Sequence, residues 1–201
     1  MNKSITLLVI LFFLSCSSEE TTLPILGEKL IDPTTGKATH YKAPEFELTN
    51  QLNQLVSNQS FENKIQIIDF FFTSCPTICP KMTQHLKKVE EAFVDENNVA
   101  IISYSIDSIH DTPERLRNYA KQYNINNNKW SLLTGERDII FELAKDYKVY
   151  AFDDSYSGTE NNLIHDGTFV LVDEQRHIRG YYNGLELNDV KRLINDIKKL
   201  L

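Results

Sequence analysis

The sequence predicts an α/β fold in which a central mixed sheet is flanked by helices. Segments with strand and helix patterns alternate along most of the chain, which is typical of a sheet covered by helices on both faces. Two β-rich segments near the end, separated by a polar turn, predict an antiparallel hairpin at one side of that sheet. A turn signal at residues 32–36 (Asp-Pro-Thr-Thr-Gly) predicts a further, N-terminal hairpin extension.

Length and composition are those of one globular domain. The chain has 201 residues, of which 41% are hydrophobic and 24% charged, and it shows no low-complexity segment or internal repeat. Its formal net charge is −7. Because nucleic-acid binding depends on clustered Lys and Arg, this charge disfavours nucleic acid as a partner.

The first residues predict an export signal. Lys3 precedes an apolar run at residues 5–14, which is too short for a comfortable bilayer span but has the length of a signal peptide. The run ends in Ser15-Cys16, which resembles a bacterial lipobox in which Cys16 becomes the lipidated first residue. The alternative is an ordinary signal peptide with an incidental cysteine.

These features predict three regions along the chain. Residues 1–15 are expected to be a lipoprotein signal peptide, residues 16–23 a flexible tether, and residues 24–201 a folded domain. The protein is then exported and anchored to a membrane by lipid, facing the periplasm or the cell exterior.

The first half of the domain predicts two central strands that are each followed by a helix. Residues 45–49 alternate like an edge strand, whereas residues 64–73 are apolar without clean alternation, which predicts burial on both faces. Residues 81–93 place apolar side chains at helical spacing. Residues 99–106 are rich in β-formers, and residues 111–123 begin a helix with proline in its first turn.

The second half continues the alternation and then changes to the hairpin. The expected elements are a short strand at 130–133, a helix at 136–145, a strand piece at 147–152, a polar loop at 153–162, hairpin strands at 168–172 and 177–182, and an amphipathic helix at 188–201.

Two cysteines follow the first central strand directly. Cys75 and Cys79 lie at a strand-to-helix turn, where helix N-terminal amides favour thiolate. Disulfide exchange, nucleophilic attack and binding of a thiophilic metal are the chemistries that suit such a pair. A structural staple is excluded, because a loop of three residues constrains the unfolded chain very little.

The position of the thiols indicates a thioredoxin-like arrangement with a different active loop. Thioredoxin-type oxidoreductases carry Cys-x-x-Cys and a proline before the penultimate strand. This chain has three residues between its cysteines, and no proline follows Pro113; His165 occupies the corresponding loop. Two thiolates and one imidazole select copper or zinc, and three-fold coordination favours copper because zinc normally takes a fourth ligand.

At this point the residues resemble a known family. Residues 72–82 (Phe-Thr-Ser-Cys-Pro-Thr-Ile-Cys-Pro-Lys-Met), residues 111–114 (Asp-Thr-Pro-Glu), residues 130–135 (Trp-Ser-Leu-Leu-Thr-Gly) and His165 resemble the Sco (SenC/PrrC) copper chaperones, over about residues 40–200. The resemblance implies that Cys75, Cys79 and His165 are copper ligands. One copper per chain, as Cu(I) or Cu(II), is expected.

The resemblance also implies partners. It predicts delivery of copper to the binuclear copper site of a cytochrome c oxidase subunit, or maintenance of that site's thiols, with an upstream copper donor and a membrane anchor.

A thiol-disulfide reductase acting on oxidase or other exported cysteines is the alternative, so the sequence leaves open whether the protein is an enzyme. A peroxiredoxin is excluded, because neither cysteine has the required Thr-x-x-Cys spacing.

Other polar residues near the motif receive secondary interpretations. Asp107 ends the second central strand and either orients a ligand or modulates the thiol pKa, or caps a turn. Ser108 replaces the proline that the family commonly has after it. His85 lies about 240° around the helix from Cys79 and should not share the metal. Met82 is expected in the core, with a weak sulfur contact as the alternative.

The remaining histidines and the aromatic run are expected to be structural. Surface positions are predicted for His40, His110 and His177, and core positions for residues 70–72 (Phe-Phe-Phe).

Overall fold

A computed structural model describes residues 22–153 and 163–201, which form a seven-stranded mixed sheet covered by helices. The strand order is β11-β10-β5-β6-β7-β3-β4, in which β5, β6 and β7 are parallel and the other pairs antiparallel. These strands are β3 (Glu47–Asn50), β4 (Leu55–Ser57), β5 (Ile65–Phe71), β6 (Val99–Ser105), β7 (Trp130–Thr134), β10 (Thr168–Val172) and β11 (Ile178–Asn183). The mixed sheet predicted from the sequence is thereby confirmed.

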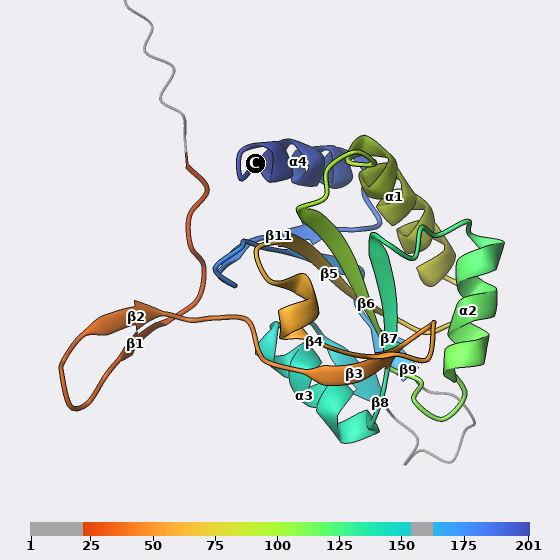
Figure 1. Cartoon of the computed structure of the whole chain (residues 1–201), viewed down its shortest axis with the longest axis horizontal. Helices are drawn as coiled ribbons and strands as arrows, with labels where there is room; N and C mark the ends of the chain where they lie inside the picture. Colours follow the sequence, from red (N-terminus) through yellow and green to blue (C-terminus); the bar gives the residue numbers. More distant parts are fainter. Residues whose placement is uncertain (1–21, 154–162) are drawn as a thin grey trace, which may run out of the picture.

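Helices cover both faces of this sheet, as predicted. α1 and α4 lie side by side on one face with α2 next to them, and α3 covers the opposite face (Figure 1). The helices are α1 (Cys79–Ala92), α2 (Pro113–Gln122), α3 (Arg137–Asp146) and α4 (Leu187–Lys198), with a short 3-10 helix, η1 (Asn58–Phe61), before β5. The β5-α1-β6 and β6-α2-β7 crossovers are what align the three central strands in parallel.

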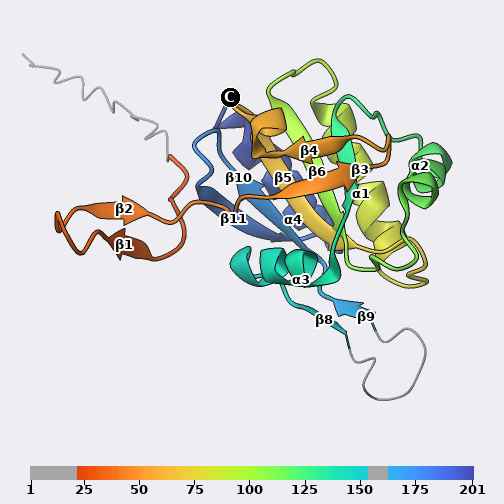
Figure 2. The same cartoon turned by 60° about the horizontal axis from the view of Figure 1, so that its bottom comes forward.

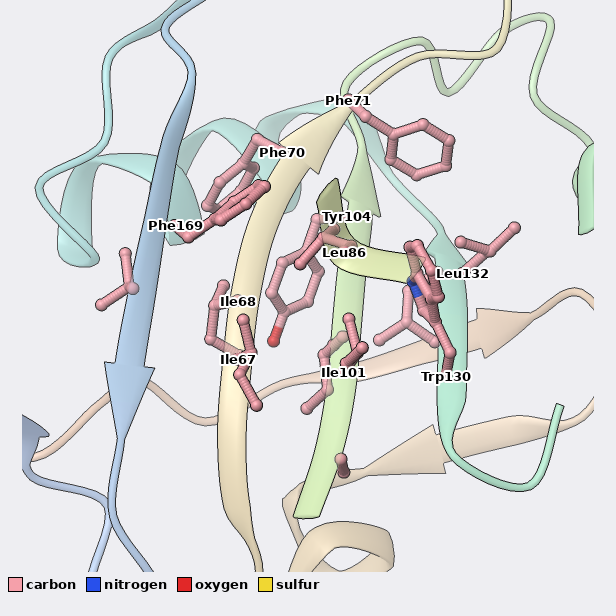
Figure 3. Close-up of a cluster of buried hydrophobic side chains, with 14 of the residues drawn as sticks. Ile67, Ile68, Phe70, Phe71, Leu86, Ile101, Tyr104, Trp130, Leu132 and Phe169 are labelled. Atoms are coloured by element: carbon pink, nitrogen blue, oxygen red, sulfur yellow. The ribbon is translucent and has the colours of Figure 1, made fainter. Parts of the chain in front are cut away.

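β5 is a fully buried central strand of the sheet. All seven of its residues are buried, and it pairs with β6 on one side and β10 on the other. Figure 3 shows its apolar side chains packed against those of β6, β7 and α1. Phe70 stacks on Tyr104 with ring centroids 5.2 Å apart. The loop that leaves β5 therefore starts from the most rigid part of the fold.

Two small antiparallel sheets lie outside the central sheet. β1 (Lys29–Ile31) and β2 (Ala38–His40) form the predicted N-terminal hairpin, which stands away from the body of the molecule (Figure 2). Its turn is held by Asp32, whose carboxylate accepts hydrogen bonds from the amides of Thr34 and Thr35. β8 (Ala151–Asp153) and β9 (Leu163–His165) form the second pair beside α3.

Three expectations from the sequence need correction. β3 is not an edge strand, because the three-residue β4, too short to give a strand pattern, pairs outside it. The strand piece expected at 147–152 begins only at Ala151 and joins β9 instead of the main sheet. α1 begins at Cys79, earlier than the expected residue 81, because proline is well accommodated in the first helical turn.

The predictions for the signal peptide, for Cys16 and for nearly all of the tether lie outside the described residues, as does most of the polar loop at 153–162. Within the part of the chain that the structure describes, no helix combines the length and apolar character needed to cross a bilayer.

Candidate metal centre

The three residues predicted as ligands meet at one place. The two sulfurs of Cys75 and Cys79 and a ring nitrogen of His165 all lie within 4.8 Å of one another. All three side chains are buried, with 7%, 1% and 6% of their residue surface exposed, respectively. Within residues 22–153 and 163–201, no other group of three or more Cys, His, Asp or Glu side chains has donor atoms close enough to share an ion.

The cysteines are positioned by the end of β5 and the start of α1. The chain leaves β5 after Phe71 and turns so that the Cys75 amide donates to the Phe72 carbonyl at 3.3 Å. Cys79 is the first residue of α1, followed by Pro80. Because the first amides of a helix are unpaired and its dipole is positive there, negative charge on sulfur is stabilised at this position.

His165 reaches the cysteines from the end of β9. Its Nδ1 lies 2.8 Å from the carbonyl oxygen of Asp166, and since a carbonyl can only accept, Nδ1 carries the proton. The lone pair of the neutral ring is then on Nε2, which lies 3.0 Å from Cys79 Sγ. The edge of the ring packs against Phe72, with centroids 5.8 Å apart. The imidazole is therefore held in the tautomer that a metal ligand requires.

The two thiols differ strongly in acidity. Interaction with the Cys79 thiol, assisted by His165, lowers the pKa of Cys75 to about 3. The same interaction, together with burial, raises the pKa of Cys79 above its usual range. The metal-free site thus favours a Cys75 thiolate beside a protonated Cys79 thiol, whose sulfur lies 3.0 Å from His165 Nε2. Cys75 is the nucleophile of the pair.

A buried carboxylate near the site was missed from the sequence. Asp69, in the middle of β5, is 2% exposed and accepts a hydrogen bond from Ser103 Oγ, which in turn accepts from Trp130 Nε1 at 2.8 Å. Burial raises the pKa of Asp69 to about 7, while the hydrogen bond from Ser103 acts in the opposite direction. Its charge also contributes to the raised pKa of Cys79. The signal was present: a carboxylate inside an otherwise apolar run is unusual for a buried strand.

The contacts of Asp107 support the turn-cap interpretation. Its carboxylate accepts from the backbone amide of His110 at 3.2 Å and lies 2.9 Å from His110 Nδ1. The hydrogen bonds that the structure gives this side chain stay within its own turn, and Asp107 is not in the three-donor group. Asp69, in contrast, is the buried carboxylate whose charge contributes to the raised pKa of Cys79.

The remaining predicted side chains lie outside the donor group. His85 is buried in α1 with Nδ1 2.6 Å from the Gly184 carbonyl oxygen, so it does not share the site, as predicted. Met82 is packed in the core, as expected. The surface position predicted for His177 is wrong, because its side chain is only 18% exposed and lies next to Asp173 and His40.

Comparison with known proteins places this geometry in a family. Residues 34–201 match the SCO1/SenC family. The SCO1/SenC family lipoprotein from Bacillus anthracis has a similar structure, with a TM-score of 0.72 and 28% sequence identity over 80% of this chain and 95% of that one. BsSco, described as a Sco-family cytochrome c oxidase assembly protein with a disulfide switch, gives a TM-score of 0.69 and 32% identity, covering 80% and 93% of the two chains.

A third solved structure carries metal. ScoI from Bradyrhizobium japonicum, solved with copper bound, shares the fold with a TM-score of 0.66 and 24% identity over 80% of this chain and all of that one. The match to the family extends over the central sheet, its helices and all three donors of the candidate site. The chain belongs to the SCO1/SenC family.

Proposed function

We propose that this protein binds one copper ion through Cys75, Cys79 and His165 and delivers it to the binuclear copper centre of a respiratory cytochrome c oxidase. The observation that carries the proposal is the buried group of two sulfurs and one nitrogen. The copper-bound state of ScoI and the description of BsSco as an oxidase assembly protein support it.

The donor set favours copper over other available metals. Thiolate and imidazole are the ligands that select copper and zinc, and structural zinc takes four protein ligands. In the described part of the chain, the donor group has three members and no fourth Cys, His, Asp or Glu. Three soft donors suit Cu(I) well, and such a site can also release its ion to an acceptor with more ligands.

The exposure of the loop sets the direction from which an acceptor approaches. Ser74, Pro76 and Thr77, the loop residues next to Cys75, are exposed, whereas the ring of His165 packs against the buried Phe72. Incoming thiolates of the oxidase subunit would therefore reach the ion past Cys75. Exchange of one ligand at a time would let copper pass between proteins without being released to water.

Copper titration of the fully reduced protein tests the binding step. One equivalent should bind tightly enough to resist a competing chelator, and Cys75→Ser, Cys79→Ser or His165→Ala should each weaken binding by at least tenfold. His110→Ala is the control, since this histidine lies outside the donor group. Unchanged stoichiometry, affinity and spectrum in His165→Ala would rule out the three-ligand site.

The delivery step is tested in cells. Deleting the gene from the source organism should lower the copper content and activity of cytochrome c oxidase, and only alleles that retain all three ligands should restore them. If Cys75→Ser restores the oxidase fully, the protein does not deliver copper through this site.

A second candidate function is favoured by the unequal acidity of the thiols. A Cys75 thiolate in front of a buried Cys79 thiol is the arrangement of a disulfide reductase. Cys75 would attack an acceptor disulfide, form a mixed disulfide and release one acceptor thiolate. Cys79 would then lose its proton to His165 Nε2 and attack Cys75 Sγ, which breaks the mixed disulfide and releases the second acceptor thiolate. The acceptor gains two electrons, the pair becomes a disulfide, and a thiol reductant must restore it.

An assay in the presence of a copper chelator distinguishes the two functions. Reduction of an oxidised peptide carrying the oxidase's copper-binding cysteines is measured with a strong copper chelator present. Turnover that persists with the chelator and in His165→Ala would favour the reductase. Turnover that is absent, with tight copper binding retained, would favour the chaperone.

We also propose that the mature protein is exported and held at a membrane by lipid on Cys16, a role supported by the sequence pattern at residues 5–16. Mass spectrometry of the N-terminal peptide should detect a diacylglycerol-type modification, and Cys16→Ala should move the protein to the soluble fraction. An unmodified Cys16 in membrane-bound protein would contradict this anchor.

A further inference from the structure

A second buried carboxylate, Asp111, holds the loop that carries Cys75. Asp111 lies just before α2 and is fully buried. Its carboxylate accepts from the Thr73 amide at 2.9 Å, from Thr73 Oγ1, and from Ser105 Oγ at 2.5 Å. It is not among the candidate ligands.

These contacts join three elements at one point. Thr73 belongs to the loop after β5, Ser105 ends β6, and Asp111 leads into α2. Arg115, in the first turn of α2, donates from Nε to Thr73 Oγ1 at 2.7 Å, and its Nε lies 3.5 Å from the Asp111 carboxylate. Thr73 is thus held through its amide and its hydroxyl, two residues before Cys75.

The network needs a carboxylate in particular. An amide N–H and two hydroxyl groups converge on Asp111, and every one of them can act as a donor. Hydrogen bonds to a charged acceptor are about twice as strong as those between neutral groups. Asparagine would fill the same space, but one of its two terminal atoms is an NH₂ group, which cannot accept from Thr73 or Ser105.

We propose that Asp111 is a positioning residue for the metal site: by fixing Thr73 it holds the Cys75 sulfur within bridging distance of Cys79 and His165. Of the two readouts that test this role, only copper affinity rests on the proposed copper-binding function. Because the same loop also sets how often the two sulfurs meet, the stability of the Cys75–Cys79 disulfide is a second readout that does not involve copper.

A matched control is available at the far end of the sheet. Asp173, in the turn between β10 and β11, is also buried, accepts from the amides of Gln175 and His177, and pairs with Arg179 at 2.9 Å. It resembles Asp111 in burial and in its partners, but it does not contact the thiol loop. A purely structural role for Asp111 would make the two variants behave alike.

The test compares Asp111→Asn with Asp173→Asn in the full-length protein. Asp111→Asn should weaken copper binding by at least tenfold in chelator competition, whereas Asp173→Asn should stay within twofold of the wild type. Asp111→Asn should also make the disulfide easier to reduce, with a tenfold change in its equilibrium with glutathione, equivalent to about 30 mV. Urea unfolding of both variants measures the structural loss separately.

Thr73 provides a second pair of variants in case Asp111→Asn does not fold. Thr73→Ser keeps the hydroxyl that Asp111 binds and should retain the wild-type copper affinity and disulfide reduction potential. Thr73→Val removes this hydroxyl and should show most of the loss in copper affinity and most of the shift in potential seen in Asp111→Asn. Equal affinity and potential in folded Asp111→Asn and wild type would overturn the proposal, and so would equal losses in Asp173→Asn. If the wild type binds no copper, the proposed function fails, and the disulfide equilibrium still decides the role of Asp111.

Discussion

At the scale of single residues, the site depends on where a few protons reside. The Asp166 carbonyl fixes the proton of His165 on Nδ1, the Cys79 thiol faces Nε2, and Cys75 carries negative charge. Metal binding must displace only the Cys79 proton, because the other two donor atoms already have free lone pairs. The site is thus largely prepared for a cation before the cation arrives.

The pH dependence of stability should reveal Asp69. The pKa of Asp69 is about 7 in the folded protein and near 3.8 when unfolded, so between these values the folded state binds the extra proton and stability falls as pH rises. Asp69→Asn removes this loss. The variant should gain stability relative to the wild type from pH 4 to pH 8, by roughly 4 kcal/mol at most.

Urea unfolding of the two proteins at each pH measures this difference. Direct comparison is needed because the lowered pKa of Cys75 acts in the opposite direction in the wild type. Asp95→Asn, at an exposed position, is the control, and its stability should change with pH in the same way as that of the wild type. A pH-independent difference between Asp69→Asn and the wild type would show that Asp69 titrates normally.

At the scale of elements, the site joins the N-terminus of α1 to the end of β9. Gly167 sits in the short link between β9 and β10, and its carbonyl accepts from the Gly184 amide at 2.6 Å. A Cβ atom added at Gly167 would lie 2.8 Å from Leu185 Cγ. This close approach ties the position of His165, two residues earlier, to the turn before α4.

Gly167→Ala should therefore disturb both stability and copper binding. Overpacking of this kind costs about 1 to 3 kcal/mol, and displacement of the β9–β10 link should lower copper affinity severalfold. The double variant with Leu185→Ala should recover much of the affinity because it makes room for the new methyl group. Chelator competition and urea unfolding of the single variant, the double variant and the wild type provide the measurement. An affinity loss that Leu185→Ala cannot reduce would contradict this packing account.

The longer elements were predictable from the sequence, whereas the shortest strands were not. The central strands and helices were predictable because each has a long, clear pattern, and the cysteines and His165 because few residues can do their chemistry. β4 and β9 were not, and β8 was predicted only with a wrong start, since strands of three residues carry no periodicity and exist only through their partners. Asp69 was absorbed into an apolar run, and Asp111 was recognised as part of a helix start but not as the acceptor for Thr73.

At the scale of the whole molecule, the ligands come from distant parts of the chain. His165 lies 86 residues after Cys79, and β6, α2, β7 and α3 intervene. The three donors come together only in the folded state, so metal binding is coupled to global folding.

Copper should consequently raise the unfolding temperature. A ligand present at 1,000 times its dissociation constant stabilises the folded state by about 4 kcal/mol, which corresponds to an increase on the order of 10 °C for a domain of this size. Calorimetry of reduced protein with and without copper measures the shift. The increase should be clearly smaller in His165→Ala, and His110→Ala should match the wild type. An equal shift in all three proteins would indicate binding outside this site.

The two-stranded sheet of β8 and β9 has a consequence for kinetics. The cysteines follow the end of the fully buried β5, whereas His165 ends a three-residue strand that, among the described residues, pairs with β8 alone. Isolated two-stranded sheets are marginally stable, and weakly held units open most often. We therefore expect His165 to dissociate from a bound ion more often than the two cysteines, because local opening of this small sheet would move the imidazole without disturbing β5.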